Sequence, residues 1–589
     1  MTERLDPAYR SSALERLGYE RFDVVIIGGG VVGCGAALDA ATRGLRVALV
    51  EASDFAAGTS SRSSKLLHGG LRYLEQGRVE LVREALRERA LLLERLCPHL
   101  AHTVPLLVPL ERRGLDRGYL GAGVAIYDLL AGRGNEVPRH RHLSKRAVLD
   151  LAPALRQDRI SGGILLHDGQ IDDARHTVAL ARTAAHHGAT VVSSARAESL
   201  IYDGERVTGV RLRDVEAKRS VTVRADVVVN AAGVWTGQLH EANEGALQLR
   251  VRASKGVHLV VPRDRIEAGT GLLLRSERSV LFVIPWGQHW LIGTTDTPWD
   301  LDFVHPAASR ADIEYLLGSV NRLLRTALTD DDIVGVYVGL RPLIHEGGSD
   351  ATTTSLSRQH AVVNLAPGLV AVAGGKYTTY RVMARDAIDA AASMLTQSVA
   401  ESCTQEVTLL GADGWRSHYN ARNQLAQRSG LDVERIEHLL GRFGTETTDL
   451  LELIREEPEL GRPLVGAPDY LAAEVRFAVA AEGALHLEDV LTRRTRISIE
   501  TADRGIAASS EVARLMAPVL GWTGGDVRRE VDAYRSRVEA ERRSHQQPTD
   551  ELAALERRAA SDVRTQSRVA REGRSGRRRR RLIRERTQR

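Results

Sequence analysis

The hydrophobic pattern near the N-terminus predicts a strand, a helix and a second strand. Residues 21–27 (RFDVVII) are mostly apolar and rich in β-branched side chains, and the run ends at Gly28, which is typical of a buried strand. Small residues continue as a predicted helix through Arg43, Gly44 ends this helix, and residues 45–51 predict the next strand. This order indicates a βαβ unit with parallel strands.

Strand patterns return through the middle of the chain and give way to helices towards its end. Residues 78–96 have helical periodicity with charges on the opposite face, as in a surface helix. The next predicted elements are strands at 190–192, 207–213, 221–230, 256–262 and 280–293, a strand with a glycine turn at 368–375, and a helix at 382–395. The pattern then stays mostly helical to about residue 543. We therefore expect an α/β protein with a helical C-terminal part.

Composition limits the class of protein. A chain of 589 residues is too long for one hydrophobic core, so two to four domains are expected. No apolar run approaches the roughly 20 residues that a membrane span needs, and the first twenty residues lack the apolar region of a secretory signal. Cys34, Cys97 and Cys403 are far apart and form no metal-ligand spacing. These features predict a cytoplasmic protein, or one attached only to a membrane surface.

The positive charge is concentrated at the C-terminus. Residues 571–589 contain ten arginines and two acidic residues, a contribution of +8 to a net charge of +5, so the rest of the chain is mildly acidic. The segment from residue 544 is polar and is interpreted as a helix fragment followed by disorder. The arginines fit a solvated end or attraction to anionic lipid headgroups. Nucleic-acid binding is less favoured because the tail lacks aromatic stacking partners.

The glycine turn between the first strand and helix predicts a dinucleotide site. Gly28 permits the tight turn, Gly30 lets the backbone approach a pyrophosphate, and Gly33 allows the helix to pack closely on the strand. The free N–H groups at the helix N-terminus would face the phosphates. Glu51 lies 23 residues after Gly28, at the end of the second strand, where an acid accepts hydrogen bonds from ribose hydroxyls.

A second loop favours FAD over NAD. Residues 58–75 (GTSSRSSKLLHGGLRYLE) are dense in hydroxyls, glycines and basic groups. Such a loop can donate hydrogen bonds to a pyrophosphate and to flavin carbonyls, and paired glycines let the chain pass close to a flat ring. The candidate cofactor residues of this loop are Ser60, Ser61, Ser64, Lys65, Leu66, His68, Gly69 and Gly70.

Several motifs in order resemble the aerobic, quinone-linked FAD-dependent glycerol-3-phosphate dehydrogenases. They are SSKLLHGGLRYLE (63–75), GGGVVG (28–33), NAAGVW (230–235), SKGVHLVVP (254–262), PWGQHWLIGTTDT (285–297), GLRPL (339–343), Ser357-Arg358 and GGKYTTYR (374–381). The resemblance spans roughly residues 20–540. It implies bound FAD, with Ala232, Gly233, Gly375 and Thr378 as further cofactor contacts, and oxidation of sn-glycerol 3-phosphate to dihydroxyacetone phosphate by hydride transfer from C2.

The resemblance also implies a fold and a division into domains. The fold is α/β, with a Rossmann-like FAD-binding domain of the amino-acid-oxidase/glutathione-reductase-like type, an interleaved antiparallel-sheet substrate (cap) domain, and a C-terminal all-α domain. The expected FAD-binding parts are residues 20–98, 190–250 and 336–398, the cap parts are 99–189 and 251–335, the helical domain is 399–543, and the basic, disordered tail is 544–589.

Oxidation of an alcohol next to a phosphate ester needs cations for the phosphate and a base for the hydroxyl proton. Arginine suits the first task because its planar fork matches phosphate. The resemblance implies that Arg72 and Tyr73 contact the substrate and that Arg341, Arg358 and Lys376 form the anion pocket. It also implies that Arg341 and Lys376 are catalytic residues. Any one arginine could instead be a surface ion pair.

For the base we favour His258, which lies on an otherwise apolar strand that resembles the active-site histidine strand of the family. A lone histidine on an apolar strand can also be a hydrogen-bonded core residue. Lys376, or a water held by Arg341, is the alternative proton acceptor. Lys255 and residues 294–297 are expected to shape the pocket.

The electron acceptor stays open between a membrane quinone, to which the resemblance points, and oxygen, which would make the enzyme an oxidase. A flavin-dependent amine or amino-acid oxidase is the other alternative, although it would not need the arginines. No calcium-loop motif is present, and no metal site is expected. We further expect a homodimer at the inner face of a bacterial cell membrane, with no specific nucleic-acid partner.

Overall fold

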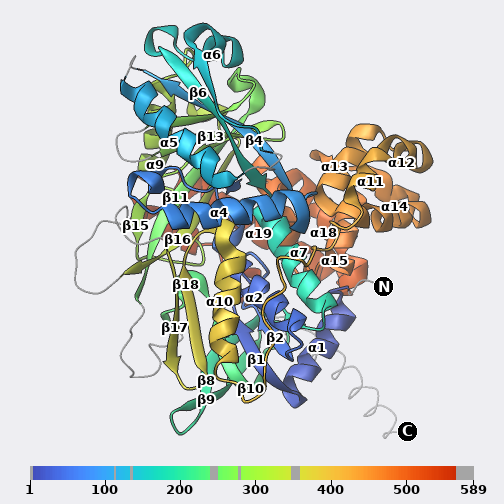
Figure 1. The fold of residues 1–589 in the computed structure, drawn as a ribbon. Coiled ribbons are helices and arrows are strands. Elements are labelled where there is room, and N and C mark those ends of the chain that lie inside the picture. The colour runs from blue at the N-terminus through green and yellow to red at the C-terminus, as the bar shows by residue number, and fades with distance from the viewer. Residues whose placement is uncertain are drawn as a thin grey trace, which may run out of the picture.

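The βαβ unit expected near the N-terminus is present, at the centre of the first of two large sheets (Figure 1). It consists of β1 (Arg21–Ile27), α2 (Val31–Thr42) and β2 (Val47–Val50). The computed structural model describes residues 4–111, 115–132, 137–238, 250–275, 280–345 and 359–565.

The first sheet is mainly parallel. Its eight strands follow the order β17-β18-β10-β1-β2-β7, and the hairpin β8–β9 pairs with β10. β1 runs parallel to both β10 and β2, so the carboxyl ends of these strands meet at one edge of the sheet. The bounds of its other strands are β7 Thr190–Val192, β8 Ala195–Asp203, β9 Arg206–Asp214, β10 Arg219–Asn230, β17 His360–Ala366 and β18 Leu369–Gly374.

Helices cover both faces of this sheet. α2, α7 (Asp173–His186) and α10 (Tyr380–Ala392) pack together over one face, where Val24 and Ile26 of β1 enter the same apolar core as their side chains. α1 (Pro7–Tyr19) covers the opposite face. Because neighbouring side chains of a strand point to opposite faces, a strand buried on both sides is largely apolar. In β1 every residue after Arg21 is buried, and the one buried acid, Asp23, pairs with Arg46.

The second sheet has ten strands and belongs to the cap domain. Its path is β15-β11-β14-β13-β12-β4-β6-β3, with β16 paired to β11 and β5 to β6. Apart from the parallel pair β4–β12, its strands are antiparallel. The strand bounds are β3 Leu66–Leu67, β4 Ala101–Leu110, β5 Arg141–Ser144, β6 Gly162–Ile171, β11 Arg250–Pro262, β12 Gly271–Arg275, β13 Val280–Trp286, β14 His289–Gly293, β15 Thr297–Trp299 and β16 Gly335–His345.

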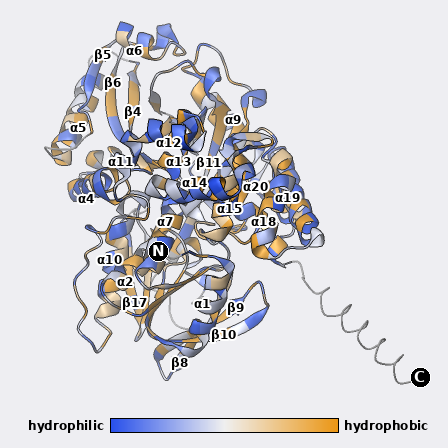
Figure 2. Cartoon of the chain, turned by 90° about the vertical axis from the view of Figure 1, so that its right-hand side faces the viewer, coloured by the Kyte–Doolittle hydropathy of each residue, from blue (hydrophilic) through white to orange (hydrophobic). Residues whose placement is uncertain are grey.

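Three helices accompany the second sheet, and two more lie between its strands β3 and β4 in the chain. The cap helices are α5 Leu115–Ala131, α6 Lys145–Leu151 and α9 Arg310–Asn321, and the other two are α3 Arg72–Glu75 and α4 Val79–Leu91. In both views α5 and α6 lie at the periphery of the molecule (Figures 1 and 2). The helix expected at residues 78–96 is confirmed as α4, which continues into a π-helical turn.

The fold class expected from the sequence is therefore confirmed, but two elements cross the expected domain boundaries. β16, expected in the FAD-binding part, pairs along its length with β11 of the cap sheet. α7, expected in the cap part, packs on α2 over the first sheet. Both assignments depend on contacts between residues far apart in sequence, which a local pattern does not contain.

The C-terminal part is helical, as expected. Its helices are α11 Trp415–Asn420, α12 Arg422–Ser429, α13 Val433–Phe443, α14 Thr447–Glu456, α15 Ala472–Ala480, α16 Leu487–Asp489, α17 Ile497–Glu500, α18 Ile506–Leu520, α19 Gly524–Ser544 and α20 Asp550–Arg558. It also contains a small hairpin of β19 (Pro463–Leu464) and β20 (Ala467–Leu471), and the 3₁₀ turn η11 (Val563–Thr565).

From residue 544 the sequence predicted a helix fragment followed by a disordered tail, and the structure corrects how far the folded part extends. The chain stays folded through α20 and η11, and Ala553 is buried against the cap domain. The carboxylate of Asp550 lies 2.5 Å from the ammonium of the buried Lys255 on β11. These partners are distant in sequence, so the polar composition of the segment concealed them. Residues 571–589 lie outside the described part of the chain.

No described helix is both long and apolar enough to cross a bilayer.

Buried ion pairs join the C-terminal helices to the first sheet. Asp54, which follows β2, accepts hydrogen bonds from Arg493 at 2.5 Å and from both terminal nitrogens of Arg494 at 2.8 Å. Arg175 of α7 forms a two-pronged pair with Glu482, at 2.6 and 3.0 Å. All five side chains are buried, so each charge depends on its partner.

Replacing Asp54 with Asn is predicted to destabilise the protein strongly, because it leaves two buried guanidinium groups short of negative charge. Breaking a buried pair costs about 3–5 kcal/mol, and the midpoint of urea unfolding should fall accordingly. The control is Asp226→Asn, which breaks an exposed pair with Arg21 of the kind worth about 0–1 kcal/mol. Equal midpoints for the two variants would contradict the prediction.

Candidate active site

The turn between β1 and α2 has the close packing that its glycines were expected to permit. Gly28 has a φ of +113°, and a Cβ on it would lie 2.6 Å from the carbonyl oxygen of Ala231. A Cβ on Gly33 would lie 1.9 Å from the carbonyl oxygen of Gly28. The first turn of α2 therefore presses on the end of β1, and its N-terminal N–H groups open towards the neighbouring loop, where Val31 donates to Ser60 Oγ at 2.9 Å.

Glu51 is held at the end of β2 by two backbone groups. Gly29 N donates to one carboxylate oxygen at 2.7 Å and Ser53 N to the other at 2.8 Å. Burial raises the pKa of Glu51, although both N–H groups act in the opposite direction. Each carboxylate oxygen has a second lone pair, so Glu51 can still accept hydrogen bonds from a ligand.

A cavity of about 720 Å³ begins at this turn and extends to the cap sheet. The expected residues that line it are Gly28, Gly30, Glu51, Ser60, Ser64, Leu66, His68, Tyr73, Ala232, Gly233, His258, Arg341, Gly375, Lys376 and Thr378. Its volume lies in the upper part of the range of ligand sites, about 300–1,000 Å³. The cavity thus connects a helix N-terminus and an acidic ribose acceptor with the candidate catalytic groups.

The described residues fit FAD. The glycine turn forms a cradle that a Cβ would fill, Glu51 is placed to accept ribose hydroxyls, and the cavity is long enough to reach the second sheet. On the far side Gly375 has a φ of +77°, and a Cβ there would lie 2.4 Å from Met383 Sδ. Glycine backbone therefore borders the cavity at both ends, where it can approach a bound ligand closely.

His258 is buried on β11 and borders the cavity. Its Nε2 lies 2.8 Å from Ser64 Oγ, and its ring stacks on Tyr337, with the planes 5° apart and the centroids 4.6 Å apart. Burial, together with Arg341 and Lys65, lowers the pKa of His258 well below its ordinary value. The imidazole is therefore neutral at physiological pH and can accept a proton.

Arg341 and Lys376 bring positive charge to the same end of the cavity. Arg341 Nη2 donates to Thr294 Oγ1 at 3.0 Å and Nη1 to the carbonyl of Thr295 at 3.2 Å. Lys376 Nζ lies 3.7 Å from the centre of the Tyr73 ring and 3.4 Å from the carbonyl oxygen of Gly69. These contacts orient both cations at the cavity wall.

Some expected residues have other positions. Gly33, Ser61, Lys65, Gly69 and Gly70 do not line the cavity. The Lys65 ammonium is fully buried and donates to Asp173 at 2.6 Å and to the carbonyl of Ser61 at 2.7 Å, so the structure gives it a place in the packing beneath the loop. Two further positions cannot be assigned: Arg358 lies outside the described residues, and of Arg72 only the backbone is described.

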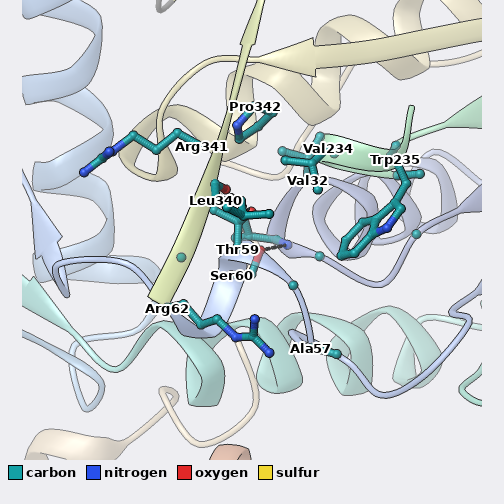
Figure 3. Close-up of a pocket in the computed structure, with 18 of the residues that line it drawn as sticks. Val32, Ala57, Thr59, Ser60, Arg62, Val234, Trp235, Leu340, Arg341 and Pro342 are labelled. Atoms are coloured by element: carbon teal, nitrogen blue, oxygen red, sulfur yellow. Dashed lines mark hydrogen bonds between the residues drawn. The ribbon is translucent and has the colours of Figure 1, made fainter. Parts of the chain in front are cut away.

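Sequence reasoning missed the contribution of the C-terminal helices. Glu488, Arg493, Arg537, Asp562 and Arg564 all line the main cavity. Arg62 and Trp235, within motifs that were recognised, also line it, and Figure 3 shows Arg62 and Arg341 extending in opposite directions beside the strand that carries Leu340 and Arg341. The arginine-rich stretch at residues 493–496 was the one feature of the sequence that could have indicated this contribution.

Two protein families match this chain. Residues 23–381 match the family described as FAD dependent oxidoreductase, and residues 402–526 match the C-terminal domain of alpha-glycerophosphate oxidase. The second match includes Glu488 and Arg493 of the cavity wall and ends before Arg537, Asp562 and Arg564.

Individual relatives agree with these families. Glycerol-3-phosphate dehydrogenase 2 of Mycobacterium tuberculosis is 54% identical, over 95% of this chain and 96% of its own length. The human mitochondrial glycerol-3-phosphate dehydrogenase is 36% identical, over 88% of this chain and 73% of its own. The crystal structure of glycerol-3-phosphate dehydrogenase from Bacillus halodurans with FAD superposes with a TM-score of 0.74 at 29% identity, covering 91% of this chain and 98% of that one.

Replacing Gly33 with Ala is predicted to abolish tight FAD binding. The added Cβ would displace the first turn of α2 from the carbonyl of Gly28, and the N–H groups that face the phosphates would move with it. The ratio of flavin absorbance to protein absorbance in the purified variant measures the loss. Gly318→Ala in α9 is the control, because a Cβ there meets nothing within 4 Å. Full flavin content in Gly33→Ala would contradict the prediction.

Proposed function

The chain belongs to the family of FAD-dependent glycerol-3-phosphate dehydrogenases, and we propose that it passes the electrons of sn-glycerol 3-phosphate, which it oxidises to dihydroxyacetone phosphate, to a membrane quinone. The observation that carries the assignment of the site is the single cavity that joins the glycine turn with His258, Arg341 and Lys376. FAD, when bound, supplies the hydride acceptor.

The substrate phosphate would bind between the cations at the cap end of the cavity. Arg341 offers a planar guanidinium that can pair with two phosphate oxygens, and Lys376 adds a point charge. Because Thr294, Thr295 and the Tyr73 ring hold these two side chains, little conformational entropy is lost when they bind the anion. Fixing the phosphate in this way orients the C2 hydroxyl for reaction.

His258 is the proposed base. Its neutral state makes it an acceptor for the C2 hydroxyl proton, and the Tyr337 stack and the Ser64 contact hold the ring in one orientation. The protonated imidazole of His258 then releases this proton to solvent, because the cations Arg341 and Lys65 disfavour a further positive charge beside them.

Replacing His258 with Ala is predicted to lower kcat about 10²- to 10⁴-fold, the usual contribution of a general base. In the unchanged enzyme the lowered pKa keeps His258 neutral at higher pH, so its protonation should reduce the rate only well below pH 6. Anaerobic stopped-flow reduction of the flavin by glycerol 3-phosphate, over a pH range that extends well below 6, measures both effects. His289→Ala, on neighbouring β14 and outside the cavity lining, is the control. An unchanged kcat in His258→Ala would exclude this role.

The surface of α5 supports the membrane part of the proposal. Three apolar side chains form one stripe on its outer face: Tyr119 is 60% exposed, Ile126 47% and Leu129 78%. An exposed apolar stripe on a helix suits contact with a bilayer surface, which supports the proposed position at the inner face of the cell membrane.

The opposite face of α5 contacts the loop that borders the cavity. Tyr127 OH accepts the N–H of Gly69 at 2.8 Å and donates to Asp168 at 2.9 Å. His68 and Tyr73, on either side of the Gly69–Gly70 pair, line the cavity. The proposed membrane surface and the reaction site are thus separated by one helix and one loop, an arrangement that suits electron delivery to a lipid-soluble acceptor.

The double variant Ile126→Ser, Leu129→Ser is predicted to bind anionic vesicles at least tenfold more weakly, because each buried aliphatic side chain contributes about 1.5–3 kcal/mol. Reduction of a quinone dissolved in those vesicles should fall in parallel, while anaerobic flavin reduction by glycerol 3-phosphate stays constant. Val465→Ser, an exposed apolar residue of the C-terminal part, is the control. Stoichiometric peroxide formation from oxygen, with no quinone reduction in the unchanged enzyme, would identify an oxidase instead.

A further inference from the structure

A second, smaller cavity lies beside the main one, between the cap strand β16 and the C-terminal helices. Its volume is about 100 Å³, room for a few water molecules. Six arginines line it: Arg62, Arg493, Arg496, Arg504, Arg537 and Arg557. Of these, Arg62, Arg493 and Arg537 also line the main cavity.

Two of the six arginines are neutralised by acids outside this cavity. Arg496 pairs with Asp172 and with Asp173, the latter at 2.5 Å. Arg493 pairs with Asp54 at 2.5 Å and with Asp489 at 2.6 Å.

The other four arginines share two glutamates. Arg504 and Arg557 both lie 3.3 Å from the carboxylate of Glu541, and Arg537 contacts Glu488. The side chain of Arg62 has no hydrogen-bond or ion-pair partner among the described residues. The wall of the cavity therefore carries a surplus of about two positive charges, the charge of a phosphate dianion.

Burial and the mutual repulsion of the arginines both disfavour the charged form of these side chains. Burial, with Arg557 and Arg62 nearby, lowers the pKa of Arg537 to about 9. Burial, with Arg493 and Arg557, lowers the pKa of Arg62 to about 10. Arginines ordinarily keep a pKa above 12. A bound anion would therefore offset the free-energy cost of burying these positive charges close together.

We propose that this cavity binds inorganic phosphate, or a tetrahedral oxyanion of the same size, and that the anion holds the C-terminal helices against the FAD-binding domain. Arg62 comes from the loop that follows β2, Arg504 from the turn between α17 and α18, Arg537 from α19 and Arg557 from α20. One anion can thus bridge all these segments, and planar guanidinium groups are the donors that fit phosphate oxygens.

This site differs from the two places in the main cavity where phosphate groups would bind, that of the FAD pyrophosphate and that of the substrate. Arg504 and Arg557 line the small cavity and not the main one. The substrate phosphate would meet Arg341, which extends away from Arg62 (Figure 3). Since the holoenzyme already carries the phosphates of FAD, any further phosphate bound by it must occupy another place.

The test is calorimetric titration of the FAD-bound enzyme with inorganic phosphate at constant ionic strength, in an Arg341→Gln background that weakens the substrate site. One phosphate per chain is expected. Adding Arg557→Gln should weaken this binding at least tenfold. Adding Arg558→Gln should leave it unchanged, because Arg558 is exposed on the same helix and pairs with Asp302 at 3.4 Å. Equal affinity in the two double variants, or no binding in the background variant, would overturn the proposal.

Two further measurements complete the test. Dihydroxyacetone phosphate in place of inorganic phosphate should bind at least tenfold more weakly, because the cavity has no room for its carbon chain, and equal binding would overturn the assignment to a free oxyanion. If Arg557→Gln fails to fold, amide hydrogen exchange of the Arg341→Gln variant tests the proposal. Exchange of residues 524–558 should be slower in phosphate than in chloride at the same ionic strength. Equal exchange in the two salts would overturn the proposal.

Discussion

The pairing of β11 with β16 is the constraint on which the rest of the site depends. The two strands are in register from Arg250 opposite His345 to Val260 opposite Gly335, so backbone hydrogen bonds fix the position of every side chain between these ends. His258 stands opposite Tyr337 and stacks on it. Four residues further along β16, Arg341 reaches the same cavity.

The same strand also joins the three parts of the molecule. The hydroxyl of Thr59, in the loop that follows β2, donates to the carbonyl of Leu340 at 2.5 Å. On the other side, Arg504 of the C-terminal part donates to the carbonyl of Val336 at 3.3 Å. A shift of β16 would therefore move the base, the phosphate-binding arginine and the wall of the dinucleotide cavity together, which makes rigidity of this ladder a condition of catalysis.

Charge distribution separates structural arginines from those that face a ligand. Arg175 and Arg494 are buried and matched by carboxylates in paired geometry, as buried charges must be. Arg341 and Arg62 border cavities, and among the described residues the carboxylate nearest to Arg341, that of Asp296, lies 3.7 Å away. Residue type alone does not distinguish these classes, because the same guanidinium serves packing in one place and anion binding in another.

The sequence by itself determined the βαβ unit and the glycine turn, and it predicted the position of Glu51 at the end of the second strand. These follow from local periodicity and from the steric freedom of glycine. That His258, Arg341 and Lys376 act in one site was predicted from the resemblance of separate motifs, and in the structure all three border one cavity. Only the tertiary structure decided that β16 belongs to the cap sheet, that Lys65 lies in the packing beneath its loop, and that Arg493, Arg537 and Arg564 of the C-terminal part complete the cavity. The physical reason is that burial and charge compensation depend on which distant segments meet, and such meetings leave no mark on the pattern of neighbouring residues.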